Sequence, residues 1–256
     1  MKKIYNYLNK YEPEIQTGKL KLERINDIKF DNVYFSYNND RQILSNISIN
    51  VNNNDKIAIV GRTGCGKTTL VNLLCRFYDV SKGSIFINGE NINNYTLESL
   101  RENIGYVMQD VVIFDGNIYD NINYANKDVQ KEQIETICKK LRLHDKIISF
   151  SEGYELNLNK NQDLFSLGEK QMINFARIMV ENPSVVILDE ITSSLSYENE
   201  ELVKNAIKEI TKDKICFIIA HRLTTIKSCN KILYMENGKI LENGSHQELM
   251  DIKGKY

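Results

Sequence analysis

The sequence predicts an α/β protein with a parallel-sheet core, preceded by an antiparallel β region. Two apolar runs, at 57–60 and 185–188, are continuous, as in parallel strands that are covered on both faces. Over 28–35 and 43–51, apolar residues alternate with polar ones, which is typical of strands with one exposed face. The two patterns together indicate two sheets of different kinds.

The other elements follow from local signals along the chain. Further apolar runs predict four more strands, at 84–87, 104–107, 215–220 and 232–235. Apolar residues recur at helical spacing over 134–141 and 172–179, and Pro183 ends the second of these stretches. The pairs Asn88-Gly89 and Asn237-Gly238 are typical of tight hairpin turns. Ser245, followed three residues later by Glu248, predicts a capping box that opens a last short helix.

Composition excludes several classes of protein. The chain is 42% hydrophobic and 26% charged, and this composition excludes disordered and fibrous chains. Its length of 256 residues is enough for an enzyme with a substantial core. Because 33 Lys and Arg balance 34 Asp and Glu, we expect no nucleic-acid partner held by bulk positive charge. The five cysteines are widely spaced without a Cys-x-x-Cys pair, which predicts free thiols. The sequence shows no pattern of a secretory signal peptide and no apolar run of about 20 residues. We therefore expect an intracellular location.

A glycine-rich motif follows the first continuous apolar run. Residues 61–68 fit the spacing G-x-x-x-x-G-K-[ST] and open a predicted helix. In such a loop, backbone N–H groups surround phosphate oxygens, Lys67 reaches the β- and γ-phosphates, and the Thr68 hydroxyl binds Mg²⁺. The alternative, a glycine-rich turn that matches by chance, is disfavoured by the strand before it and the helix after it. The residues expected to bind nucleotide here are Gly61, Arg62, Thr63, Gly64, Cys65, Gly66, Lys67, Thr68 and Thr69.

One residue of this loop, Cys65, carries a thiol. Lys67 and the helix N-terminus both favour a thiolate, so we expect Cys65 to be the cysteine most sensitive to alkylation, and bound nucleotide to protect it. The alternative is that Cys65 points into the protein behind the loop and is inert.

Two carboxylates, Asp189 and Glu190, follow the second continuous apolar run. They stand at the carboxyl end of a predicted parallel strand, the edge of an α/β sheet where ligands bind. Asp189 would hold Mg²⁺ through a bound water, and Glu190 would polarise the attacking water as a general base. An acidic pair here can also be a helix cap or a solvated loop; the phosphate-binding motif favours the catalytic interpretation.

Further motifs occur in the order found in one protein family. Ile104-Gly-Tyr-Val-Met-Gln109 resembles a Q-loop, Phe165-Ser-Leu-Gly-Glu-Lys-Gln171 lies where the signature LSGGQ is expected, Ser193-Ser-Leu-Ser196 occupies the D-loop, and Ile219-Ala-His221 resembles an H-loop. Tyr37, ahead of the phosphate-binding motif, matches an aromatic A-loop residue. On these motifs the chain, from about residue 20, resembles the nucleotide-binding domain of ATP-binding cassette (ABC) transporters, more closely the exporter type.

The resemblance implies a fold and a division of the chain. The fold is that of a P-loop NTPase, with a RecA-like parallel-sheet core, an N-terminal antiparallel β subdomain and an inserted helical subdomain at about 110–178. Residues 1–27 would be a linker from a membrane domain, and residues 28–256 the nucleotide-binding domain. We expect the chain to be a fragment of a fused exporter rather than a free-standing subunit.

The resemblance also implies roles for residues outside the phosphate-binding motif. Tyr37 would stack on adenine, Gln109 would sense Mg²⁺ and the γ-phosphate, and His221 would contact the γ-phosphate. Ser166 and Gly168 would bind the ATP of a partner subunit. The implied cofactors are ATP and Mg²⁺, the residues around the metal are Thr68, Gln109 and Asp189, and the catalytic residues are Glu190, His221, Gln109 and Lys67. The alternative for Tyr37 is a strand-edge aromatic residue, which its offset before the phosphate-binding motif disfavours. Taken alone, Gln109 would be a solvated polar residue.

The implied activity is ATP hydrolysis coupled to export. Two such domains, identical or different, would close around ATP and drive transmembrane domains, so that the chain lies at the cytoplasmic face of a membrane. Four positions depart from the family pattern and bear on coupling: Leu167, Glu169, Ser196 and Lys160. One alternative is a non-transport ABC ATPase that clamps nucleic acid or a ribosome; the near-neutral charge disfavours it. Another is a regulatory ATP-binding module without turnover, which Glu190 disfavours.

Overall fold

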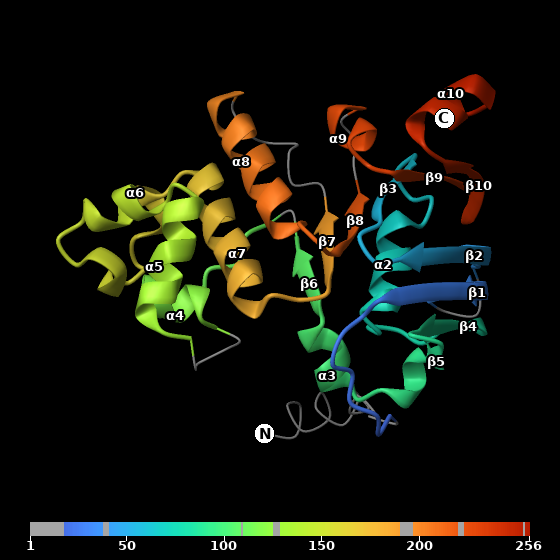
Figure 1. Cartoon of the computed structure of the whole chain (residues 1–256), viewed down its shortest axis with the longest axis horizontal. Helices are drawn as coiled ribbons and strands as arrows, with labels where there is room; N and C mark the ends of the chain where they lie inside the picture. The colour runs from blue at the N-terminus through green and yellow to red at the C-terminus, as the bar shows by residue number, and fades with distance from the viewer. Residues whose placement is uncertain are drawn as a thin grey trace, which may run out of the picture.

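The structure, a computed structural model, describes residues 18–37, 41–108, 110–124, 129–189, 197–219, 223–252 and 254–256. In Figure 1 the two sheets lie together in one half of the molecule, and a group of helices, α4 to α7, extends away from them. This arrangement confirms the predicted α/β fold with a parallel core and an antiparallel β subdomain.

The smaller sheet is antiparallel and has the order β2-β1-β4-β5. Its strands are β1 (Asp27–Phe35), β2 (Leu44–Asn52), β4 (Lys82–Ile87) and β5 (Glu90–Asn91). Buried and exposed residues alternate along most of β2, as the sequence pattern predicts for a sheet with one face on the core. The turn between β4 and β5 places Asn88 at φ 52° and Gly89 at φ 79°, the left-handed pair of a tight hairpin.

The larger sheet has the order β10-β9-β3-β8-β7-β6. Its strands are β3 (Lys56–Gly61), β6 (Ile104–Val107), β7 (Val185–Asp189), β8 (Ile215–Ile219), β9 (Lys231–Glu236) and β10 (Lys239–Gly244). All neighbouring pairs are parallel except β9 and β10, which form a hairpin. Every residue of β8 is buried because helices or the smaller sheet cover both faces. The carboxyl ends of β3, β6, β7 and β8 therefore meet at one edge.

Nine α-helices lie in the described residues. They are α2 (Lys67–Leu74), α3 (Leu97–Glu102), α4 (Ile118–Ile122), α5 (Lys131–Lys140), α6 (His144–Ile148), α7 (Leu167–Glu181), α8 (Tyr197–Ile210), α9 (Leu223–Lys227) and α10 (His246–Ile252). Short 3-10 turns occur at Ile92–Asn94, Gly153–Glu155 and Gln162–Leu164. None of the described helices has the length and apolar character required to span a bilayer.

The segment before β1 packs against the domain. Leu22 and Ile25 are buried in the core, and the backbone N–H groups of Lys19 and Leu20 donate to the Asn94 carbonyl. The packed chain thus begins before residue 27, the end expected for the linker. Residues 1–17 lie outside the described part of the chain.

A buried arginine attaches α7 to the segment that follows β6. The Arg177 guanidinium donates to the carbonyl oxygens of Asn121 (2.6 Å) and Val112 (2.7 Å) and to the Asn121 side-chain oxygen (2.9 Å). It also lies 4.9 Å from the centre of the Phe114 ring. Asn121 is fully buried and bonds in turn to the backbone of Phe114. Residues 112–121 and α7 are therefore held as one unit.

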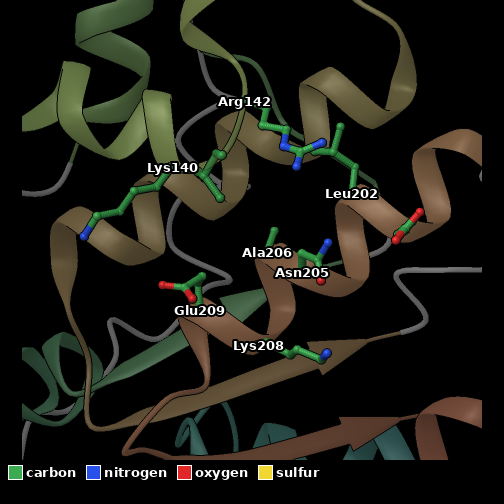
Figure 2. Close-up of a pocket in the computed structure, with 9 residues that line it drawn as sticks. Lys140, Arg142, Leu202, Asn205, Ala206, Lys208 and Glu209 are labelled. Carbon is green, nitrogen blue, oxygen red and sulfur yellow. The ribbon is translucent and has the colours of Figure 1, made fainter.

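An open groove of about 570 Å³ separates the end of α5 from α8 (Figure 2). Its charged side chains are of both signs and belong to Lys140, Arg142, Glu201, Lys208 and Glu209. In Figure 2, Lys140 and Lys208 point to different sides of the groove, so the cations do not converge on one point. None of the residues expected to bind nucleotide lines this groove.

Candidate nucleotide-binding site

The phosphate loop, residues 61–66, joins β3 to α2 and depends on its glycines. Gly61, Gly64 and Gly66 have φ angles of 149°, 78° and 106°, which favour glycine because it lacks a Cβ atom. At Gly61 a Cβ atom would also lie 2.2 Å from the Met235 carbonyl oxygen. The glycine spacing in the sequence therefore reflects both backbone conformation and close packing.

The β9–β10 turn supports the loop from behind. The Gly238 N–H donates to the Cys65 carbonyl (3.1 Å), and the Ser45 N–H of β2 donates to the Gly238 carbonyl (2.8 Å). The loop is thus fixed by strands from both sheets. This nonlocal support preorganises its backbone for a ligand.

The N-terminus of α2 carries no cap of its own. Its N-cap residue, Gly66, makes no side-chain hydrogen bond, and the first turn holds no acidic residue. The first N–H groups of a helix have no partner within the helix, and together with the helix dipole they attract an anion. The N-terminus of α2 therefore has the chemistry that a phosphate group requires.

Lys67 lies against the start of the loop. Its side chain is 7% exposed, and its ammonium donates to the carbonyl oxygens of Gly61 (2.9 Å) and Arg62 (3.2 Å). From there the ammonium can exchange carbonyl oxygens for phosphate oxygens. Thr68, the next residue, is exposed on the first turn of α2.

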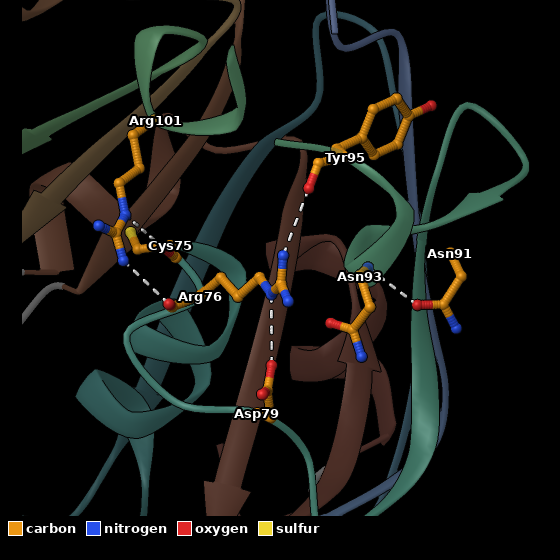
Figure 3. Close-up of polar contacts among 7 residues, drawn as sticks. All are labelled: Cys75, Arg76, Asp79, Asn91, Asn93, Tyr95 and Arg101. Atoms are coloured by element: carbon orange, nitrogen blue, oxygen red, sulfur yellow. Dashed lines mark hydrogen bonds and ion pairs between the residues drawn. The ribbon is translucent and has the colours of Figure 1, made fainter. Parts of the chain in front are cut away.

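Two arginines fix the other end of α2 (Figure 3). Arg101 of α3 donates from Nε to the carbonyl of the C-cap residue Cys75 (3.3 Å) and from Nη2 to the carbonyl of Arg76, the next residue (3.0 Å). A cation therefore lies at the C-terminus of α2, where it is favoured. Arg76 bonds to Asp79 (3.3 Å) and to the Tyr95 carbonyl (3.4 Å). These contacts hold the axis of α2, and with it the phosphate loop, in place.

Asp189 ends β7 at the same edge of the sheet. It pairs in register with Ile219 of β8, and Ile219 pairs with Ile59 of β3, just before the phosphate loop. The Tyr106 hydroxyl on β6 donates to Oδ2 of Asp189 (3.2 Å). Burial, then the charge and hydrogen bond of Asp189, raise the pKa of Tyr106, so the phenol remains a donor. The hydroxyl of Thr68 and the carboxylate of Asp189 are oxygen donors, which fit Mg²⁺.

Tyr37 follows β1 and connects to α2. Its hydroxyl lies 3.1 Å from Oγ1 of Thr69, and its ring contacts those of Phe35 and Tyr78 edge-on, with 4.9 Å between centroids in each pair. Tyr37 is nevertheless 47% exposed. A half-exposed aromatic ring can stack on a planar group.

The expected signature residues stand at the N-terminus of α7. Ser166 is the N-cap: its Oγ accepts from the Glu169 N–H (3.3 Å), and the Glu169 carboxylate accepts from the Ser166 N–H (2.7 Å). Gly168 lies buried in the first turn. Glu169, a departure from the family pattern, therefore completes a capping box.

Three expected catalytic residues, Gln109, Glu190 and His221, and the D-loop residue Ser196, lie outside the described residues. In the sequence, Gln109 closely follows β6, Glu190 directly follows β7, and His221 closely follows β8. These strands end at the edge where β3 meets the phosphate loop.

The expectation of a reactive Cys65 is wrong. Its side chain is 6% exposed and belongs to the apolar core with Leu70 and Met235. A buried thiol is inert because reagents cannot reach it. All five cysteines are free and buried, as the spacing predicts for free thiols.

Comparison with known protein families identifies the chain. Residues 44–193 match the family model described as ABC transporter. The chain belongs to the ABC transporter family.

Individual ABC proteins resemble the chain over most of its length. It is 42% identical over 230 residues to the putative multidrug export ATP-binding/permease protein YgaD of Bacillus subtilis, covering 90% of this chain and 40% of that protein. It is 40% identical to the mitochondrial iron-sulfur clusters transporter ABCB7 of Oryzias latipes, covering 89% of this chain and 30% of that protein. The chain therefore spans less than half the length of these relatives.

A solved ABC transporter structure has the same fold. The structure of a bacterial Atm1-family ABC exporter with ATP bound superposes with a TM-score of 0.87 and 32% identity. The superposition covers 99% of this chain and 45% of the exporter chain. Both sheets and the helical region thus belong to an arrangement seen in an exporter.

Proposed function

We propose that the chain is the ATP-binding and ATP-hydrolysing domain of an ABC exporter. One observation carries the proposal: the uncapped N-terminus of α2, the glycine-rich loop and Lys67 form an anion site at the sheet edge where Asp189 ends β7. An anion site beside a metal-binding carboxylate suits Mg²⁺ and a nucleoside triphosphate.

Binding would use residues from three parts of the chain. The exposed ring of Tyr37 stacks on adenine, the N–H groups of residues 61–66 surround the phosphates, and Lys67 contacts the β- and γ-phosphates. Thr68, Gln109 and Asp189 hold Mg²⁺, which neutralises charge on the phosphates when bound. The Tyr37–Thr69 contact links the adenine platform to the helix that begins at the phosphates.

Hydrolysis would depend on residues at the ends of β6, β7 and β8. Glu190 accepts a proton from the attacking water, while Gln109 and His221 contact the γ-phosphate and its metal. Each residue directly follows, or closely follows, a strand that ends beside the phosphate loop. Parallel topology thus supplies one set of catalytic groups from distant parts of the sequence.

A second nucleotide-binding domain would complete the site. Ser166 and Gly168 of one domain would contact the ATP of the other, and closure would drive transmembrane domains from the cytoplasmic face of a membrane. The printed names of the relatives, a multidrug export protein and an iron-sulfur cluster transporter, support export. No observation favours the alternative of a clamp on nucleic acid or a ribosome.

Replacing Glu190 by Gln tests the proposal. We expect ATP affinity to be retained and turnover to fall by about 100-fold or more, the scale of a lost general base, with an ATP-bound dimer accumulating. Turnover is followed by phosphate release and association by size exclusion with ATP. Glu132→Gln, on the exposed side of α5, serves as the control and should leave both unchanged. Wild-type turnover in Glu190→Gln, or no ATP binding by the unaltered chain, would contradict the proposal.

A further inference from the structure

We infer that Tyr106 is a positioning residue that orients Asp189 for Mg²⁺. The inference deepens the proposed function and rests on it, because Asp189 is the carboxylate expected to hold the metal. Nothing in the sequence motifs assigns a role to Tyr106. Its hydroxyl donates to Oδ2 of Asp189 at 3.2 Å.

Strand register explains how Tyr106 reaches this carboxylate. Tyr106 of β6 pairs with Ile187 of the neighbouring strand β7, and Asp189 is the next residue of β7 on the same face. The long phenol side chain spans the diagonal between the two strands. The contact therefore follows from the parallel pairing of β6 with β7 and needs no loop.

The hydrogen bond fixes a torsion that is otherwise loose. The terminal torsion of an aspartate is broad and two-fold, so an unrestrained carboxylate samples many orientations. A donor on one oxygen selects one of them. Groups that hydrogen-bond to metal ligands in this way tune metal affinity, and their loss costs about 10- to 100-fold.

Tyr106 is suited to hold a fixed position. Its ring packs against the apolar core that contains Ile187 and Ile219, on the sheet face toward α2. The group at the carboxylate is therefore a hydroxyl donor held on a strand of the sheet.

A purely structural role would look different. The hydroxyl of Tyr95, for example, donates to the backbone carbonyl of Ile87 within the smaller sheet. Tyr106 instead directs its hydroxyl to a side chain at the sheet edge that carries the phosphate loop. Its loss should therefore act on the metal and leave the fold intact.

The test compares ADP binding with and without Mg²⁺ in Tyr106→Phe. ADP is not hydrolysed, so affinity is measured without turnover. In EDTA we expect the affinity to stay within about twofold of the unaltered chain, and the Mg²⁺ concentration for half-maximal tightening to rise about tenfold. Equal weakening with and without Mg²⁺, or no change in the Mg²⁺ requirement, would overturn the inference.

Tyr119→Phe is the matched control. Its hydroxyl also donates to a carboxylate, that of Glu135 (2.7 Å), but in the helical region away from the sheet edge. We expect this variant to keep the Mg²⁺ requirement of the unaltered chain. An equal rise in both variants would overturn the inference.

A double substitution shows whether Tyr106 acts through Asp189. In an Asp189→Asn background, Tyr106→Phe should cause no further loss of Mg²⁺ dependence. A further tenfold loss there would overturn the inference. If ADP binding by the unaltered chain does not depend on Mg²⁺ at all, the metal site of the proposed function fails, which is a distinct result.

Discussion

The helices α2 and α7 both begin where phosphate is expected, but their N-termini are built in opposite ways. At α2 the N-cap is Gly66, and no side chain accepts from the first turn. At α7 Ser166 and Glu169 satisfy two of the N–H groups within the chain. The α2 N-terminus can remain open because the loop before it is fixed by two sheets. The α7 N-terminus is expected to meet nucleotide only when a second domain arrives, so it must be stable alone.

Capping does not prevent Ser166 from binding phosphate. A hydroxyl has one donor hydrogen and two acceptor lone pairs, so Oγ can accept from Glu169 and still donate to an oxygen of a ligand. The same box, with the same distances of 2.7 and 3.3 Å, links Ser245 and Glu248 before α10. The α10 box therefore provides a control without a proposed ligand.

The largest effect should come from Gly66→Ala, which should distort the loop at the open N-terminus of α2. Gly66 has φ 106°, and an added Cβ would lie 2.6 Å from Cδ2 of Leu44. A left-handed conformation costs about 1–2 kcal/mol in other residues, and relief of this strain would twist the loop. We expect ATP to bind at least about tenfold more weakly, since about 1.4 kcal/mol corresponds to tenfold, as measured by nucleotide titration.

Gly89→Ala separates strain from binding. Gly89 has φ 79° and no atom within 4 Å of an added Cβ, and it lies in the β4–β5 turn. This variant should be less stable by about 1–2 kcal/mol but should bind ATP normally. Normal ATP binding by Gly66→Ala would show that the α2 N-terminus is not the phosphate site.

An intermediate effect is expected for Ser166→Ala. Loss of the cap should lower the free energy of unfolding by about 1 kcal/mol, and loss of a hydrogen bond to charged phosphate, worth about 1.5–3 kcal/mol, should lower ATPase activity about tenfold. Ser245→Ala should lose the same stability without losing activity. Urea unfolding and phosphate release measure the two quantities. Equal ATPase activity in Ser166→Ala and Ser245→Ala would show that Ser166 only caps its helix and does not contact ATP.

The smallest effect concerns the charge of Glu169. Glu169→Gln keeps the capping box, because glutamine also accepts at this position, but removes a negative charge near the expected γ-phosphate. We expect stability to fall by about 0.3–1 kcal/mol and ATP-driven association to tighten about two- to threefold, as measured by analytical ultracentrifugation. In Glu248→Gln only stability should change. Weaker association of Glu169→Gln would mean that the carboxylate helps the partner to bind.

Local signals in the sequence were sufficient for much of the fold. The strands β3, β7 and β8 were predicted because continuous apolar runs are typical of buried parallel strands. The capping box of Ser245 and Glu248 is confirmed. It is predictable from the sequence because all its partners lie within four residues. The helices α3 and α8 have weaker signals in the sequence. The first is short and has few apolar positions, and the second follows residues that resemble a D-loop rather than a helix start.

Side-chain directions and contacts between distant parts of the chain could not be predicted from the sequence. The family signature at 165–171 indicates a ligand-binding role for Ser166 and does not reveal that Glu169 completes the cap of α7. The inward direction of Cys65 depends on the turn of the loop, which spacing alone does not fix. The Tyr106–Asp189 contact requires the register of β6 with β7. Alternation along both strands, once they are paired, would have placed the two side chains on one face.

The order of strands in the larger sheet has a consequence for synthesis on the ribosome. β3, which leads into the phosphate loop, pairs only with β8 and β9 among the described strands, and both come from the last part of the chain. The turn that supports the loop, at Gly238, is later still. During translation, the phosphate loop therefore emerges early but acquires its neighbours near the end. We therefore expect a nascent chain to hold nucleotide in this loop only after β8, β9 and the following turn have left the exit tunnel.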